Sequence, residues 1–262
     1  MDSPGNSSGR MPTLFVGHGT PMNAILNNQW TRAFKNLSNE IPRPSAILSI
    51  SGHFYTPGIY VTDNEAPPTI HDFGGFPQEL FDIQYPCPGS PDLAQHVSEM
   101  LGGHAHLTDK WGLDHGTWSV LIHMYPEADI PVVQMSIDSR VEPEIHVAIG
   151  RELAPLRDAG VLILGTGNIT HNMRVGFWQQ EKGVVPDWSA HFDKLVADAT
   201  MAHDAAELAR LAESEAGEAA HSDFDHYYPL LYVAGAANGN DPVSYPITGF
   251  DRAFSMRSVK FG

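Results

Sequence analysis

Short runs of Val, Ile and Leu alternate along the chain with amphipathic stretches, a pattern typical of layered α/β proteins. We expect strands at 13–17, 45–51, 59–62, 131–137, 160–165, 243–247 and 254–260. We expect helices at 29–38, 91–101, 116–124, 142–157, 187–201 and 224–236. The alternation predicts an α/β fold: a single domain with a central mixed, largely parallel sheet flanked by helices.

The segments that connect these elements are short and rich in Pro and Gly, and none is long enough to separate two domains. We therefore expect one domain over residues 11–262, preceded by a disordered extension over residues 1–10. The long irregular stretch at 63–77 carries aromatic residues, which favours an ordered loop that covers a site. Residues 202–222 are rich in Ala, Glu, Asp and His, and we expect a solvated helix followed by a surface loop there.

The charge balance argues against two classes of partner. The chain has 15 Lys and Arg against 31 Asp and Glu, a net charge of −16, and no segment gathers its cations. Nucleic acid and anionic membranes both need clustered Lys and Arg, so we expect neither as a partner. The oligomeric state stays open between a monomer and a small homo-oligomer.

The cysteine count limits both the compartment and the metal chemistry. Cys87 is the single cysteine of the chain, which rules out an intramolecular disulfide and a thiolate-rich metal site. A lone thiol suits a reducing compartment, and no secretory leader or apolar run of about 18 residues is present. We therefore expect a cytoplasmic protein in which any metal is held by histidines and carboxylates.

Five histidines stand on turns punctuated by Gly, Asp or Asn, and most of these turns follow a predicted strand. His18 follows 13–17, His53 follows 45–51, and His171 follows 160–165. His115 comes directly after a candidate helix cap, and His226 begins an apolar helix. Because ligands bind beyond the carboxyl ends of strands in α/β folds and imidazole is the commonest metal ligand, the pattern predicts a metal site at those strand ends.

Other interpretations compete for the same residues. A turn histidine often does no more than bond a backbone carbonyl, and His171 is equally suited to act as a general base. No predicted strand runs into a GxSxG elbow, and the sequence has no phosphate-binding GxxxxGK[ST], no HExxH and no CxxC. We expect the remaining histidines, apart from the one in the long loop, to be surface or packing residues: His96, His104, His106, His123, His146, His191, His203 and His221.

The motifs around these five histidines resemble those of the DODA-type extradiol aromatic ring-opening dioxygenases of the LigB superfamily, which include bacterial and plant 4,5-DOPA dioxygenases. The resemblance runs from Met11 to the C-terminus, and seven motifs in the same order make it specific for the family. The matching stretches are residues 15–22, 49–53, 67–77, 112–118, 134–138, 167–172 and 226–231.

The resemblance implies roles for the five histidines. In that family the residues that match His18, His53 and His226 are metal ligands, and the one that matches His171 is either a further ligand or the acid/base. The residue that matches His115 assists catalysis from the pocket. Where the protocatechuate-type relatives complete the site with Glu, this chain has His226 next to Asp225, so the third ligand and the preferred metal stay open.

The resemblance also implies a reaction. A non-haem Fe(II) would bind a catechol and O₂ together, and the expected substrate is L-DOPA, whose 4,5-cleavage gives 4,5-seco-DOPA, which cyclises to betalamic acid. Zn(II) is expected in the protein as isolated, because zinc outcompetes iron at nitrogen sites. Two alternatives stay open at this stage: a zinc-dependent hydrolase on the same scaffold, and a metal-binding protein without catalysis.

Substrate contacts are expected from the long loop and from two aromatic residues. Asp72 either pairs with the ammonium group of L-DOPA or caps a turn. Aromatic side chains are expected to wall the pocket, and these are Phe73, Phe76, Trp118 and Tyr227. The expected substrate-binding set is His71, Asp72, Trp118 and Tyr227.

Overall fold

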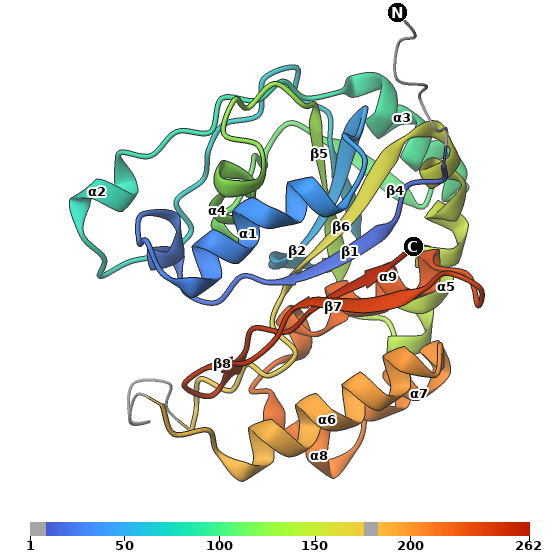
Figure 1. The fold of residues 1–262 in the computed structure, drawn as a ribbon. Helices are drawn as coiled ribbons and strands as arrows, with labels where there is room; N and C mark the ends of the chain where they lie inside the picture. The colour runs from blue at the N-terminus through green and yellow to red at the C-terminus, as the bar shows by residue number, and fades with distance from the viewer. Residues whose placement is uncertain (1–8, 176–182) are drawn as a thin grey trace, which may run out of the picture.

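The computed structural model describes residues 9–175 and 183–262. Its centre is an eight-stranded sheet with the strand order β4-β3-β5-β2-β6-β1-β10-β7 (Figure 1). The strands of this sheet are β1 Thr13–Gly17, β2 Ala46–Thr56, β3 Ile59–Thr62, β4 Ala105–Thr108, β5 Val132–Asp138, β6 Val161–Gly167, β7 Val243–Ile247 and β10 Ser258–Phe261. A separate small ribbon pairs β8 Phe250–Asp251 with β9 Phe254–Ser255.

The middle of the sheet is parallel, and its two sides are not. β5, β2, β6 and β1 run parallel to one another, so their carboxyl ends lie at one edge. β3 pairs antiparallel with β5, and β10 pairs antiparallel with both β1 and β7. The predicted mixed, largely parallel sheet in a single α/β domain is therefore confirmed.

Helices cover both faces of the sheet (Figure 1). The α-helices are α1 Gln29–Glu40, α2 Gln78–Phe81, α3 Pro91–Met100, α4 His115–Met124, α5 Pro143–Leu153, α6 Asp187–Met201, α7 Ala205–Ala212, α8 Glu215–Ala220 and α9 Tyr228–Ala236. The 3₁₀ helices are η1 Pro21–Ala24, η2 Ala154–Ala159 and η4 Phe224–His226. Within the described part of the chain, no helix is both long enough and apolar enough to cross a membrane.

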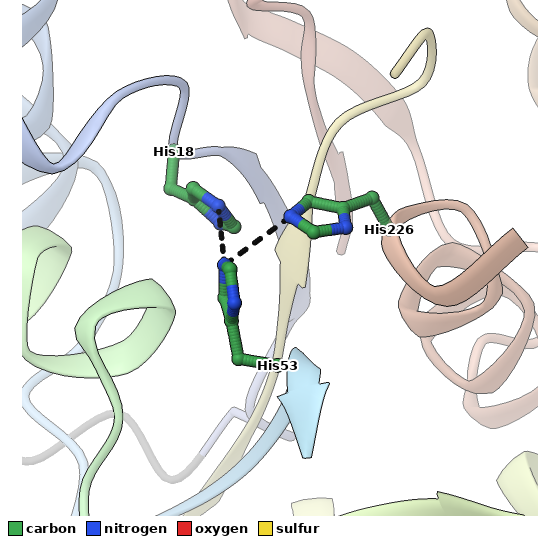
Figure 2. Close-up of side chains that lie close together, drawn as sticks. All are labelled: His18, His53 and His226. Carbon is green, nitrogen blue, oxygen red and sulfur yellow. Dashed lines mark hydrogen bonds between the residues drawn. The ribbon is translucent and has the colours of Figure 1, made fainter. Parts of the chain in front are cut away.

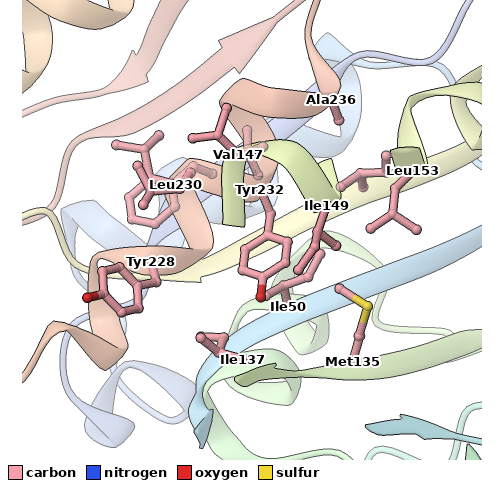
Figure 3. Close-up of a cluster of buried hydrophobic side chains, with 14 of the residues drawn as sticks. Ile50, Met135, Ile137, Val147, Ile149, Leu153, Tyr228, Leu230, Tyr232 and Ala236 are labelled. Atoms are coloured by element: carbon pink, nitrogen blue, oxygen red, sulfur yellow. The ribbon is translucent and has the colours of Figure 1, made fainter. Parts of the chain in front are cut away.

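Two apolar clusters lie on opposite faces of the sheet. One includes residues of α1 and α4, such as Phe34 and Trp118. The other fills the space between the sheet, α5 and α9, where Ile50, Val147 and Tyr232 are fully or almost fully buried (Figure 3). α9 is apolar on all sides, as is typical of a helix that is buried all round and not of one with a solvent-exposed face.

Most predicted elements lie within a few residues of the observed ones, and the exceptions concern length and burial. β2 continues to Thr56, so His53 lies inside a strand and not on a turn after it. The predicted strand at 254–260 is two short strands in different sheets, and the predicted helix at 142–157 gives way to η2 at Ala154. β4 and β8 were not predicted, because each is too short to show a clear period of two.

The segment at 202–222 differs most from expectation. It forms α7 and α8, and its apolar side chains are buried against the sheet-flanking helices, Leu208 being 1% exposed. The expected helix is present as α7, but one of its sides is buried, and the expected surface loop is wrong because α8 takes its place. Small residues such as Ala and Gly give short helices little hydrophobic pattern in the sequence. Residues 1–8 of the expected disordered extension lie outside the described residues, and Arg10 contacts Asp158 at 3.1 Å.

The backbones of α5 and α9 come into direct contact at two glycines, and this contact is testable. A Cβ atom on Gly235 would lie 2.2 Å from the carbonyl oxygen of Val147, and one on Gly150 would lie 2.3 Å from that of Tyr232. We expect Gly235→Ala to lower the free energy of unfolding by roughly 1–3 kcal/mol in a denaturant titration, because the two helices must separate.

The control is Gly239→Ala, whose added Cβ atom would have no neighbour within 4 Å. A Gly235→Ala protein as stable as wild type would show that the α5–α9 interface tolerates a methyl group. Alanine also raises helix propensity by about 1 kcal/mol at such a position, so any net loss understates the steric cost.

Candidate metal centre and pocket

The parallel centre of the sheet places two of the predicted histidines side by side. His18 follows β1, and its backbone N–H bonds to the carbonyl of Gly167 at the end of β6 at 3.0 Å. His53 lies near the end of β2, at the irregularity in its pairing with β5 between Ile50 and Tyr55. This irregularity re-aims the side chain of His53 toward the end of the sheet.

The third histidine reaches the same place from the other end of the chain. His226 ends η4, immediately before α9, and its carbonyl accepts a hydrogen bond from the backbone N–H of Asn168 at 3.0 Å. A Cβ atom on Gly167 would lie 2.0 Å from that carbonyl, so β6 must end in glycine for the two segments to approach. A Cβ atom on Gly52 would lie 3.0 Å from the Cα of His226.

These three histidines turn their Nε2 atoms toward one another (Figure 2). The Nε2 atom of His53 lies 3.3 Å from that of His18 and 3.2 Å from that of His226. Imidazole nitrogens bound to one ion at about 2.1 Å lie roughly 3.0–3.4 Å apart, depending on the angle at the ion. The donor set therefore fits a single divalent metal.

Burial and neighbouring charges shift the pKa values of these three histidines. Burial lowers the pKa of His18 and His226 well below the ordinary value, and the neighbouring imidazoles lower it further. Burial alone would lower the pKa of His53 too, but the carboxylates of Asp72, Asp114 and Asp225 raise it. The imidazoles of His18 and His226 are therefore neutral, and anionic carboxylates surround His53, a combination that suits a cation.

His171 lies beside His226, but it does not belong to the set of donor atoms formed by His18, His53 and His226. Its ring stacks on that of His226, with centroids 3.6 Å apart and planes 8° from parallel. The Nε2 atoms of His18, His53 and His226 form one compact set of donors, whereas His171 groups with Asp225 and His226. Burial lowers the pKa of His171 well below the ordinary value, so its imidazole is neutral near pH 7 and accepts a proton.

His115 begins α4, and a carboxylate fixes its ring. Asp114 caps this helix, as expected, by accepting from the backbone N–H of Thr117 at 3.2 Å. Asp72 accepts from the backbone N–H of His115 at 2.9 Å and contacts its Nδ1 atom at 3.0 Å. Burial lowers the pKa of His115 to about 4, so this imidazole is neutral as well.

Two further carboxylates stand behind the ligands. Asp225 Oδ1 lies 2.9 Å from Nδ1 of His226, and burial raises the pKa of this carboxyl group. Asp114 is fully buried, accepts from Ser51 Oγ at 2.7 Å and also accepts from Gln134 Nε2. Burial, followed by the charge of Asp72, raises the pKa of Asp114 to about 6.

Asn168 forms hydrogen bonds with the segments that carry His18 and His226. Its side-chain oxygen accepts from the backbone N–H of Gly19 at 3.1 Å, and its side-chain nitrogen donates to the carbonyl of Ser255 at 2.8 Å. Its backbone N–H donates to the carbonyl of His226, as described above. One residue therefore joins the loop after β1, the end of β6, the start of α9 and the β9 ribbon.

A cavity of about 250 Å³ opens onto the histidines. Its wall is mostly apolar and aromatic on the side away from them. The lining residues are His18, Gly19, Thr20, Pro21, His53, Asp72, Phe73, Phe76, His115, His171, Met173, His226 and Phe254. A second cavity, of about 200 Å³, lies at Arg151 and His203 and contains none of the five histidines.

The structure brings together all five predicted histidines and Asp72, but three other predicted residues stand outside the lining. Tyr227 is fully buried and donates to the carbonyl of Leu208 at 2.8 Å. Trp118 donates to the carbonyl of Ile70 at 2.8 Å, and His71 Nε2 lies 3.0 Å from the carbonyl of Ile83. Trp118 and His71 contact Phe73 and so support the wall from behind.

Sequence reasoning missed five lining residues, two of which are Gly19 and Pro21 on either side of Thr20. Thr20, Met173 and Phe254 all face the cavity. Thr20 lies two residues from His18, and Met173 two residues from His171, so proximity in the sequence was an available signal. Phe254 lies in the β8–β9 ribbon, and no local pattern places that ribbon at the site.

Comparisons with known proteins agree with this geometry. Residues 11–254 match the family model described as the catalytic LigB subunit of aromatic ring-opening dioxygenase. The chain is 46% identical to the 4,5-DOPA dioxygenase extradiol of Escherichia coli (strain K12), over 98% of this chain and 96% of that protein. It is 39% identical to the protein of the same name from Beta vulgaris, over 95% of this chain and 96% of the relative.

A solved structure shows the same fold. The crystal structure of an uncharacterized protein from Escherichia coli K12 matches with a TM-score of 0.83 and 39% sequence identity, covering 97% of this chain and all of the other. The family model and the relatives span almost the full length described above, including every strand that positions a histidine. The chain therefore belongs to the LigB family of aromatic ring-opening dioxygenases.

Proposed function

We propose that this ring-cleaving dioxygenase uses Fe(II) to open L-DOPA or a closely related catechol by extradiol cleavage. The observation that carries the proposal is the convergence of three imidazole Nε2 atoms on an aromatic-walled cavity that two further histidines line. The names of the similar proteins from Escherichia coli and Beta vulgaris support L-DOPA as the substrate. Cleavage at the 4,5-bond would give 4,5-seco-DOPA, which cyclises to betalamic acid.

The ligands in this proposal are His18, His53 and His226. A non-haem Fe(II) supplies adjacent open positions for the catechol oxygens and for O₂, and it lowers the pKa of the phenolic hydroxyl groups. Zn(II) fits the same nitrogens and is expected in protein purified without added iron. A reducing cytoplasm, which the single buried Cys87 suits, would keep the iron in the ferrous state.

His171 is the proposed proton acceptor. Its neutral imidazole lines the cavity and stacks on the ring of His226, so it borders the space where a catechol oxygen would lie. A catechol that loses both phenolic protons needs a base for the second one, and the neutral imidazole of His171 has a free lone pair to accept it.

His115 is proposed to support charge on the oxygen atoms during cleavage. Because Asp72 contacts its Nδ1 atom, the Nε2 atom of His115 is the nitrogen left to face the cavity. Phe73, Phe76 and Phe254 surround the catechol ring in this proposal and exclude water, which strengthens each electrostatic contact in the site.

The first experiment tests the reaction itself. We expect anaerobically prepared protein loaded with Fe(II) to consume one O₂ per L-DOPA, with both atoms of ¹⁸O₂ appearing in the ring-opened product. Zn(II)-loaded protein is the control and should consume none, because zinc has no accessible redox chemistry. Hydrolysis of a test ester or amide by the zinc form, with no O₂ uptake by the iron form, would contradict the proposal.

The ligand assignment makes a separate prediction. We expect His53→Ala to remain folded but to retain less than roughly one-tenth of an equivalent of metal after dialysis against a chelator, since one of three ligands is lost. His104→Ala, at an exposed position, is the matched control and should retain metal as wild type does. A full equivalent of metal in His53→Ala would remove this residue from the ligand set.

The role of His171 separates acid–base help from metal binding. We expect His171→Phe to keep its metal and to lower kcat by roughly 10²-fold, as for the loss of a general base. His115→Phe should lower kcat more mildly. Metal analysis and turnover are measured on the same preparations, so loss of metal from His171→Phe would mark it as a ligand. Turnover within a few-fold of wild type would make it a structural residue.

A further inference from the structure

One carboxylate on the long loop contacts two of the five histidines at once. Asp72 Oδ2 lies 3.1 Å from Nδ1 of His53 and 3.0 Å from Nδ1 of His115. Its other oxygen, Oδ1, accepts from the backbone N–H of His115 at 2.9 Å. The rings of His53 and His115 lie with centroids 3.9 Å apart, so Asp72 joins a proposed metal ligand to a proposed catalytic histidine.

An ionised carboxylate only accepts hydrogen bonds, and this fixes where the imidazole protons lie. If Nδ1 of each ring faces Asp72, each Nδ1 atom carries the proton, and each Nε2 atom keeps a free lone pair. In His53 that lone pair points to the other two ligands. In His115 it belongs to the ring edge away from Asp72, on a residue that lines the cavity.

The loop is held in place immediately before Asp72 by other contacts. Ile70 donates its backbone N–H to the carbonyl of Leu113 at 2.7 Å and accepts from Trp118 at 2.8 Å. His71 Nε2 lies 3.0 Å from the carbonyl of Ile83. The carboxylate is therefore positioned by the fold and does not depend on substrate for its place.

We propose that Asp72 is a positioning residue that sets the Nδ1–H tautomer of His53 and His115 together, so that both Nε2 atoms serve the reaction. The part of the inference that concerns His115 rests on the proposed function, in which this histidine supports charge on the oxygen atoms. It differs from the expectation that Asp72 binds the ammonium group of L-DOPA, because both of its oxygens already contact the protein.

Other carboxylates in the site do not stand in for Asp72. Asp114 accepts from Ser51, Gln134 and the backbone of Thr117, and Asp225 contacts His226. Among the residues that the structure describes, Asp72 is the side chain that contacts Nδ1 of His115. Such outer partners orient metal-binding histidines and typically change metal affinity by about 10–100-fold when they are removed.

The first measurement is made on the wild-type protein with Zn(II) bound. Nitrogen-15 NMR of the histidine rings should show His53 and His115 as Nδ1–H tautomers, with His115 assigned from the spectrum of His115→Phe and His53 from the contacts of its ring protons with those of His115. An Nε2–H tautomer at His115 in this wild-type spectrum would by itself overturn the proposal.

The second measurement uses Asp72→Asn, which keeps the size of the side chain but replaces one acceptor oxygen with a donor. We expect Zn(II) affinity to fall by roughly 10–100-fold in a chelator competition. We expect kcat of the iron-loaded enzyme to fall by a similar factor for L-DOPA and for 3,4-dihydroxyphenylpropionate, which lacks the amine. Asp82→Asn, at an exposed position next to α2, is the matched control and should change neither quantity.

The outcomes separate positioning from substrate recognition. A rise in KM confined to L-DOPA, with normal Zn(II) affinity, would assign Asp72 to the ammonium group and overturn the proposal. Unchanged affinity and unchanged kcat would overturn it as well. The tautomers and the Zn(II) affinity do not require ring cleavage, so a wild-type enzyme that consumes no O₂ would refute the proposed function and leave this inference to be judged on its own measurements.

Discussion

The close approach of β6 to η4 is the constraint on which the clustering of the histidines depends. Gly167 ends β6 against the carbonyl of His226, and the next residue, Asn168, donates its backbone N–H to that same carbonyl. The side chain of Asn168 then holds the backbone of Gly19, next to His18. His18 and His226, which are more than 200 residues apart in the sequence, are thus held in one place by backbone contacts and by the side chain of Asn168.

The electrostatics of the site follow from this crowding. Five imidazoles occupy a buried region where a charged form is costly, so His18, His171 and His226 have pKa values well below the ordinary one. Asp72 and Asp225 lie against Nδ1 atoms of the histidines, and the Nε2 atoms of His18, His53 and His226 face one another. A divalent cation would bind the lone pairs of the three Nε2 atoms and would be attracted by the nearby carboxylates. Among the described residues, no carboxylate belongs to the cluster formed by these three atoms.

Much of this arrangement could be predicted from sequence, because strand ends are local features. Runs of Val, Ile and Leu followed by Gly-rich turns indicated His18 and His171, and the cap at Asp114 indicated the helix start at His115. The direction of a side chain inside a helix was not predictable in the same way. Tyr227 adjoins His226 yet points into the core, since neighbouring residues of a helix face different sides. Phe254 reaches the cavity only through the pairing of β8 with β9, which no local pattern encodes.

The site also departs from the rule that buried polar atoms find partners. Within the described residues, Nδ1 of His18 is buried without a hydrogen bond, and so is Oγ1 of Thr166, one residue before Gly167. The Nε2 atoms of His18, His53 and His226 face one another, and two of them form a hydrogen bond only where one carries a proton and the other does not. Each buried atom left without a hydrogen bond costs free energy in the folded state, typically about 1–3 kcal/mol. A cation bound by these Nε2 atoms, as proposed above, would remove part of this cost, so metal binding would then also stabilise the fold.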